Sequence, residues 1–290
     1  MPHGFDEFAV IDWSGAAVAR PPGLALAHAQ AGVAAPRLVA FPGGWSRGAL
    51  LDWLAAQAAA GRRMLIGLDL SAGFPFLDAA AYFPGWNGSP PDGPALWAAV
   101  EAHCANEPHL GANAFLAHAE IRRHFRHQGD CGDLFPAGRG RLRVCEGGQA
   151  AQGLNPYSCF NLVGAAQVGK SSLTGMRVLH RLRGTLPVWP FDPVPDKGPL
   201  IVEIYTALAA RTANPARRGT KIRDGAALDM ALAAFASRAH SPLDRYTDHA
   251  TDALLTTAWL RHVAHDAQFW SPAGLSRAIA ETEGWTFGVN

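Results

Sequence analysis

A short apolar run that ends on a carboxylate, Phe8–Ser14, constrains the fold of this chain more than any other stretch. In an extended strand successive side chains point to opposite faces, so Asp12 shares a face with Phe8 and Val10. Because the run is apolar on both faces, it is typical of a central strand that is buried on both sides. Asp12 then lies near the carboxyl end of a buried strand, where a charge is costly unless another group compensates it.

Three later stretches repeat this arrangement of a carboxylate beside an apolar run. They are Leu65–Asp69, Leu200–Glu203, and Asp248–Asp252 at the start of an apolar helix. We therefore predict one acidic site, built from the carboxylates of Asp12, Asp69, Glu203, Asp248 and Asp252.

The late helix gives the reason to expect a metal ion at this site. Asp248 and Asp252 are four residues apart and share a helix face, and Leu255 and Trp259 continue the same stripe toward the sheet. No Lys or Arg lies on that stripe to neutralise the two acids. Mg²⁺ or Mn²⁺ would do so, because both ions take oxygen ligands from a few carboxylates and water.

Each acid also has an ordinary structural explanation. Asp248 suits the N-cap or first turn of a helix, where a negative charge is favourable. Glu203 suits a strand end paired with an arginine, while Asp12 and Asp69 suit turns that follow strands. The joint occurrence of these acids beside buried runs is what favours a shared site.

The order of elements predicts an α/β fold in a single domain, residues 1–290. Residues 1–70 read as three strands, a helix and a fourth strand, with the later elements at Leu24–His28, Arg37–Phe41, Ser46–Ala60 and Met64–Leu70. After residue 198 we expect a strand, two helices and a short edge strand, at Leu200–Tyr205, Ala226–Ala239, Thr247–His262 and Gly284–Val289.

Residues 71–198 interrupt this order. They are dense in Pro and Gly, and they are too long to be a plain connection. Helices are expected in this part at about Ala95–Glu101 and Asn113–His127. We therefore predict an insertion that forms a wall or lid over the acidic site.

Composition limits the functions open to the chain. With a net charge of +1, no global field draws the protein to nucleic acid or to a membrane, so such a contact depends on a local patch. No apolar run approaches the roughly 20 residues that span a membrane, and the N-terminus has no signal-peptide pattern. The 4 cysteines include no C-x-x-C pair, which favours reduced thiols and a cytoplasmic location. The sequence does not fix the oligomeric state.

Seven short stretches together resemble a known family. They are Ala9–Trp13, Ile66–Asp69, Val168–Met176, Val188–Asp192, Val202–Tyr205, Asp252–Leu254 and Glu283–Val289. In this order they resemble the family called domain of unknown function 429, which is described as predicted nucleases of RNase H fold. The segment Asp248–Leu255 is also similar to the last helix of RuvC-type resolvases. The resemblance implies an RNase H-like mixed five-stranded sheet with helices on both faces and an acidic cluster at one end.

A site of this kind leads us to expect a metal-dependent nuclease that hydrolyses phosphodiester bonds of DNA or RNA. Asp12 would bridge two Mg²⁺ or Mn²⁺ ions, and Asp69 and Asp252 would complete their ligand shells. Glu203 or Asp248 would bind metal or orient the attacking water.

Basic residues are expected to contact the phosphates of a nucleic-acid partner. His249 is either a proton shuttle or an ordinary surface residue in the first turn of the late helix. Arg143, Lys170 and Arg177 are the expected substrate-binding residues. They stand among two basic groups, formed by Arg122, Arg123, Arg126, Arg139, Arg141 and Arg143, and by Arg211, Arg217, Arg218, Lys221 and Arg223. A solvated charged face also explains such groups.

Three alternatives remain. Gly164–Ser171 matches the P-loop pattern G-x-x-x-x-G-K-[ST], with a candidate strand at Cys159–Val163 and a candidate helix at Ser171–Leu182, but no later apolar run ends in the Asp that would hold Mg²⁺. The segment Asp12–Gly15 is similar to the phosphate-binding hairpin of actin-like ATPases and sugar kinases, although no second Gly-rich hairpin follows near Asp69. A non-catalytic nucleic-acid-binding module of the same fold is the third alternative.

Overall fold

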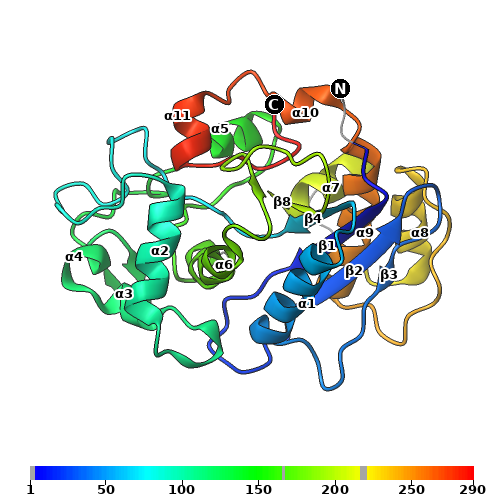
Figure 1. Cartoon of the computed structure of the whole chain (residues 1–290), viewed down its shortest axis with the longest axis horizontal. Coiled ribbons are helices and arrows are strands. Elements are labelled where there is room, and N and C mark those ends of the chain that lie inside the picture. The colour runs from blue at the N-terminus through cyan, green and yellow to red at the C-terminus, as the bar shows by residue number, and fades with distance from the viewer. Residues whose placement is uncertain (1–3, 165–166, 216–220) are drawn as a thin grey trace.

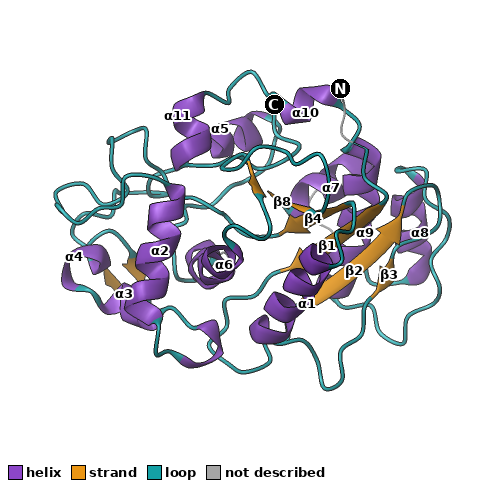
Figure 2. Cartoon of the chain, in the orientation of Figure 1, coloured by secondary structure: helices purple, strands orange, loops and turns teal. Residues whose placement is uncertain are grey.

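The computed structural model describes residues 4–164, 167–215 and 221–290, and a mixed β-sheet lies at its centre (Figures 1 and 2). In the described residues six strands join in the order β3-β2-β1-β4-β8-β7. Antiparallel pairs link β3 to β2 and β2 to β1, whereas β1, β4, β8 and β7 run parallel. The strands are β1 Glu7–Asp12, β2 Ala25–Gln30, β3 Arg37–Leu38, β4 Met64–Leu68, β7 Val188–Trp189 and β8 Leu200–Glu203. The expected α/β class with a mixed sheet is therefore confirmed.

The sheet differs from the expectation at two places. It has six strands rather than five, because Val188 and Trp189 pair in parallel with β8 and add an edge strand from within residues 71–198. The edge strand expected at Gly284–Val289 is reduced to a single bridge between Thr286 and Glu203. Gly284 and Gly288 have φ of 68° and 89°, and a backbone with two left-handed residues cannot continue as an extended strand.

Helices cover both faces of the sheet, as expected. On one face α1 (Arg47–Ala59) and α6 (Val168–Leu182) pack against strand residues such as Ile11 and Leu68. On the other face the strands pack against α7 Thr206–Ala213, α8 Gly225–Ala233 and α9 Asp248–Val263. The short helices α10 (Ala267–Trp270) and α11 (Arg277–Thr282) follow α9.

Residues 71–198 form most of the part of the molecule that lies beyond α6 from the sheet (Figure 1). Their other elements are α2 Gly93–Cys104, η1 Pro108–Leu110, α3 Asn113–Ala117, α4 Ala119–Arg122, β5 Arg126–His127, β6 Asp130–Cys131 and α5 Val144–Ala151. The single helix expected from Asn113 to His127 is broken at His118, whose ψ of 129° is extended. One continuous cluster of buried side chains includes both this part and the strands.

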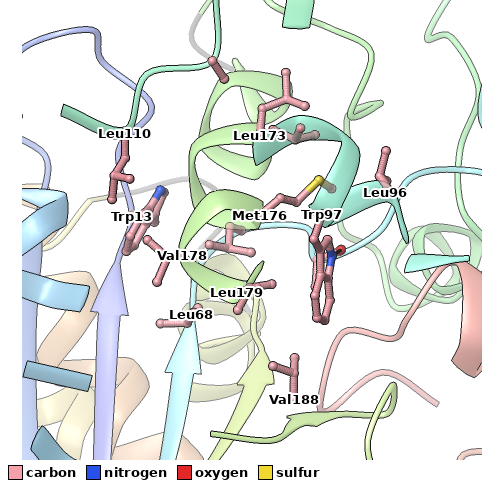
Figure 3. Packing of buried hydrophobic residues seen from close by; sticks show 14 of the residues in the cluster. Trp13, Leu68, Leu96, Trp97, Leu110, Leu173, Met176, Val178, Leu179 and Val188 are labelled. Carbon is pink, nitrogen blue, oxygen red and sulfur yellow. Dashed lines mark hydrogen bonds between the residues drawn. The ribbon is translucent and has the colours of Figure 1, made fainter. Parts of the chain in front are cut away.

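Helix α6 is the element that joins this part of the chain to the sheet. Leu173, Met176 and Leu179 pack between Trp13 and Trp97 in the core (Figure 3). The loop after β1 lies directly on the first two turns of α6, and Trp13 Nε1 donates a hydrogen bond to Thr174 Oγ1 in the second turn (3.0 Å).

Gly15 shows how close this approach is. A Cβ atom at Gly15 would lie 2.4 Å from the backbone carbon of Lys170, so only glycine permits the loop to touch the helix here. The contact brings Lys170 next to the carboxyl end of β1.

Among the described residues, no helix combines the length and the apolar character that a membrane span requires.

Candidate acidic site and its cleft

Asp12 and Asp69 lie side by side at one edge of the sheet. Ile11 of β1 is in register with Leu68 of β4, and the amide of Asp69 donates a hydrogen bond to the carbonyl oxygen of Ile11 (3.0 Å). Asp12 and Asp69 are the next residues of the two parallel strands, so their side chains point to the same face. The structure thus brings together the two acids that the sequence places at strand ends.

The first turns of α9 lie close to these two carboxylates. Thr247 rather than Asp248 is the N-cap of α9, because Thr247 Oγ1 accepts a hydrogen bond from the amide of Ala250 (3.2 Å). His249 Nδ1 forms a hydrogen bond with Asp12 Oδ2 (3.0 Å). Asp252, one turn further along, is close enough to influence the titration of both Asp12 and Asp69.

The carboxyl group of Asp69 has no cationic partner among the described residues. It accepts hydrogen bonds from the amide and hydroxyl of Thr206, at the start of α7 (3.3 and 3.2 Å). Burial and the neighbouring charges of Asp12 and Asp252 raise the pKa of Asp69 to about 8, although the Thr206 hydrogen bonds oppose the rise.

Asp12 is buried more deeply than Asp69, and His249 partly compensates the charge of its carboxylate. Its exposed fraction is 6%. Burial raises the pKa of Asp12 and Asp252 adds to the rise, while the hydrogen bond with His249 acts in the opposite direction. The same hydrogen bond raises the pKa of His249, because a neighbouring carboxylate favours the charged imidazolium.

The two acids of α9 have cationic partners. Lys221 Nζ lies 2.9 Å from Asp252 Oδ2, and Arg223 pairs with Asp248. Within the described parts of the chain, no three or more His, Cys, Asp or Glu side chains stand close enough together to hold a metal ion. Asp248 and Asp252 thus lie in the same region as Asp12 and Asp69, but Lys221 and Arg223 pair with their carboxylates.

Glu203 does not join the cluster, and the sheet register explains why. Glu203 pairs with Leu68, one residue before Asp69, so its side chain points to the opposite face. There Arg143 holds it in a bidentate ion pair with distances of 2.8 and 2.6 Å. The amide of Ala72 donates to the same carboxylate (2.8 Å). The arginine pairing considered as the ordinary explanation is what the structure contains.

Of the three expected substrate-binding residues, Lys170 alone faces open space. Arg143 is 2% exposed and is held by Glu203 and Glu146. Arg177 is fully buried and donates to Glu101 (2.6 Å) and to the carbonyl oxygen of Gly111 (2.7 Å), which leaves it no surface for a substrate. Lys170 is partly exposed, and its ammonium group makes no hydrogen bond or ion pair with the described residues.

The two basic groups predicted from the sequence differ in the acids that they contact. Arg122, Arg123 and Arg141 pair with Asp130, Asp133 and Asp78 at the surface. Lys221 and Arg223 reach the acidic cluster instead. Arg217 and Arg218 lie outside the described residues.

A cleft of about 480 Å³ opens beside the carboxylates. Asp69 and His249 line it on one side, and Lys170 and Ser171 of α6 line it on another. Its lining also includes residues that the sequence analysis did not select, namely Glu146, Gln149, Tyr157 and Tyr205. No spacing or motif marks them, because they come from three separate segments that only the fold brings together.

The structural context of a P-loop is missing. The residues before Gly164 form a turn and a single bridge, between Asn161 and Arg126, rather than the strand expected at Cys159–Val163. Residues 165 and 166 of the motif lie outside the described residues. Lys170 lies within the first turn of α6.

No family model matches the chain, and neither a curated protein nor a solved structure matches it. The site is therefore interpreted from its own geometry.

Proposed function

We propose that this protein is a metal-dependent nuclease with an RNase H-like fold, which hydrolyses phosphodiester bonds of DNA or RNA. The observation that carries the proposal is the pair Asp12 and Asp69, in register at the ends of two parallel strands, with Asp69 lacking a cationic partner among the described residues. Two carboxylates that burial and mutual repulsion disfavour are stabilised when a divalent cation binds them.

The strand order supports the fold proposed for this site. Three strands in antiparallel succession, followed by β4 and β8 in parallel beside the first strand, form a mixed sheet with an acidic end. This is the arrangement that the sequence resemblance implies, with β7 as an addition at the edge. The similarity of Asp248–Leu255 to a resolvase helix is in line with the position of α9 beside Asp12.

The donor set fits Mg²⁺ or Mn²⁺ in its chemistry. Asp12, Asp69 and Asp252 would hold the ion with hard carboxylate oxygens, but they would first have to move closer together than they lie in the structure. Asp252 would first exchange its ion pair with Lys221 for the metal. The ion would supply Lewis-acid polarisation of the phosphate and an activated water.

The other groups of the cleft have separate tasks in this proposal. Lys170 is free to bind a phosphate oxygen. His249 keeps Nδ1 on Asp12, so its Nε2 is left to exchange a proton with the substrate.

A cleavage assay tests the proposal directly. We expect the wild-type protein with Mn²⁺ to cleave at least one of labelled single-stranded DNA, duplex DNA, branched DNA, RNA and an RNA–DNA hybrid. Asp12→Asn is expected to lower the rate by about a hundredfold or more, since it removes one charge from the groups that stabilise the reaction. Asp52→Asn, an exposed residue of α1, is the matched control and should cleave like the wild type. Absence of cleavage on every substrate, or equal cleavage by Asp12→Asn, would contradict the proposal.

A second prediction concerns metal affinity without activity. Because the Lys221 ammonium competes with a cation for Asp252, Lys221→Ala is expected to strengthen Mn²⁺ binding by roughly threefold to tenfold in isothermal titration calorimetry. Lys197→Ala, at an exposed lysine away from the acids, is expected to bind like the wild type. Weaker binding by Lys221→Ala would show that Asp252 is not a ligand.

A further inference from the structure

The cleft beside the acidic site has a polar inner end as well as a charged opening. Arg143, Glu146, Gln149 and Glu203 all line it and are each less than 5% exposed. Asp69, His249 and Lys170 line the same cleft and are partly or fully exposed. A ligand that enters past the carboxylates therefore meets a buried group of hydrogen-bonding side chains.

One atom of that inner group lacks a partner, and the network around it fixes its orientation. Thr286 Oγ1 donates its proton to the Glu203 carboxylate (2.5 Å), which can only accept. Thr286 Oγ1 must therefore accept a hydrogen bond from Gln149, whose Nε2 lies 2.9 Å away. The amide of Gln149 is thereby oriented, and its Oε1 accepts no hydrogen bond from the described residues although the residue is 4% exposed.

The oriented oxygen Gln149 Oε1 determines which chemical group of a ligand can bind at the inner end of the cleft. Gln149 Oε1 is held in place and reaches the surface of the cleft without a donor from the described residues, so a ligand that brings an N–H group to it is favoured. A phosphate or a carboxylate brings only acceptors. The Arg143 guanidinium offers such an anion little, because Glu203, Glu146 and the carbonyl oxygen of Glu283 already accept from it.

Two tyrosines line the same cleft and indicate a flat ligand. Tyr157 is 43% exposed, and Tyr205 is partly buried at the start of α7. Burial and the nearby Asp69 and Tyr157 raise the pKa of Tyr205 to about 12. Both phenols therefore lie near the acidic site. Aromatic side chains of this kind provide stacking surfaces for the faces of nucleobases.

The volume limits how much of a nucleic acid can enter. A space of about 480 Å³ is in the range of sites that take a single small molecule. The opening carries Lys170, which suits a phosphate, and the inner end carries an acceptor, which suits an N–H edge. In a duplex the bases are stacked and their Watson–Crick edges are paired, so only an unpaired base can enter a cleft of this size and present that whole edge.

We propose that the cleft binds one unpaired nucleobase with an exocyclic amino group, stacked on Tyr157 and hydrogen-bonded to Gln149 Oε1, and that the substrate strand is therefore single-stranded at this position. This rests on the proposed nuclease function for the identity of the partner. The base lies toward Gln149 and the backbone phosphate stays at Lys170, beside Asp69.

Binding without metal tests this proposal apart from cleavage. Fluorescence anisotropy in EDTA would compare labelled single-stranded DNA octamers of adenine, cytosine or thymine with a duplex of the same length. Thymine has no exocyclic amino group, so it offers Gln149 Oε1 only its single ring N–H, which lies between two carbonyl acceptors. We expect the adenine and cytosine octamers to bind about three to ten times more tightly than the thymine octamer, and all of them more tightly than the duplex.

Two variants identify the residues. Tyr157→Ala is expected to weaken binding of the adenine octamer by about tenfold, whereas Tyr157→Phe, which keeps the ring, should bind like the wild type. Gln149→Met is expected to remove the preference for adenine over thymine, and circular dichroism would confirm its fold. Phe41→Ala, an exposed aromatic residue outside the cleft, is the control.

The outcomes separate this proposal from the nuclease proposal. Equal affinity for duplex and single strands, or wild-type binding by Tyr157→Ala, would overturn the base-binding cleft even if the protein cleaves nucleic acid. Binding that depends on Tyr157 and Gln149, in a protein that cleaves no substrate with Mn²⁺, would support the cleft and contradict the nuclease.

Discussion

Replacing Arg143 with methionine is expected to lower the free energy of unfolding by about 3–5 kcal/mol, because removal of one partner of a buried ion pair leaves the other charge buried and uncompensated. Arg143 and Glu203 are 2% and 3% exposed, so the change leaves the carboxylate of Glu203, and with it that of Glu146, buried without its cation. The amide of Ala72 and the hydroxyl of Thr286 still donate to Glu203, but they do not neutralise its charge. Urea denaturation of the metal-free protein at neutral pH measures the loss.

A double variant shows whether the unpaired charge is the cause. Arg143→Met combined with Glu203→Gln is expected to recover part of the loss, because the second change removes the uncompensated charge. Arg277→Met, which breaks an exposed pair with Glu281, should cause no measurable change. If the double variant is less stable than Arg143→Met, the loss arises from packing and not from charge.

Replacing Asp69 with asparagine is expected to stabilise the metal-free protein at pH 8 and to have almost no effect at pH 4. The pKa of Asp69 is raised from an ordinary value of 3.8 to about 8 in the folded protein. Between these values the unfolded chain releases the proton and the folded protein keeps it, so stability falls as pH rises through this window. Asparagine has no such charge, and its side-chain oxygen can still accept from Thr206.

The size of this effect follows from the shift. At 1.36 kcal/mol per pKa unit, a shift of this size gives a gain of about 2–5 kcal/mol at pH 8. The melting temperature in EDTA should then rise by roughly 5 °C or more, with no rise at pH 4. Saturating Mn²⁺ should reverse the order, because only the wild type gains from the ion. A lower melting temperature for Asp69→Asn at pH 8 in EDTA would contradict the assigned environment of this carboxylate.

The sequence was sufficient for the central strands and for the acids at their ends. The apolar run before Asp12 and the run before Asp69 each describe a buried strand, and buried strands in parallel bring their carboxyl ends to one edge. The stripe on α9 likewise predicted that Asp252 faces the sheet. These inferences use only local patterns, which is why they hold.

Glu203 shows what local patterns cannot supply. Its run resembles the run that ends at Asp69, yet a register offset of one residue turns its side chain to the other face. Register between strands that are 130 residues apart in sequence is set by the packing of the whole sheet. The ion pairs of Lys221 and Arg223 with the acids of α9 could not be predicted for the same reason, because they depend on the path of the intervening chain.

The parts between residues 71 and 198 were predictable only in outline. Dense Pro and Gly predicted irregular structure, but not that Val188–Trp189 would extend the sheet or that α6 would enter the core. Tyr157 and Gln149 are candidate binding residues only because they line the same cleft. A cleft formed by separate segments cannot be recognised from a sequence pattern.

The contact between Gly15 and the start of α6 has a mechanical consequence. Asp12 and Lys170 stand on two elements that touch through their backbones, with Trp13 and Thr174 bonded beside them. Neither element can shift without displacing the other, so the backbone positions of Asp12 and Lys170 are fixed relative to each other, and only the Lys170 side chain can adjust. Under the proposed function, a phosphodiester substrate would have to fit between these two fixed backbone segments.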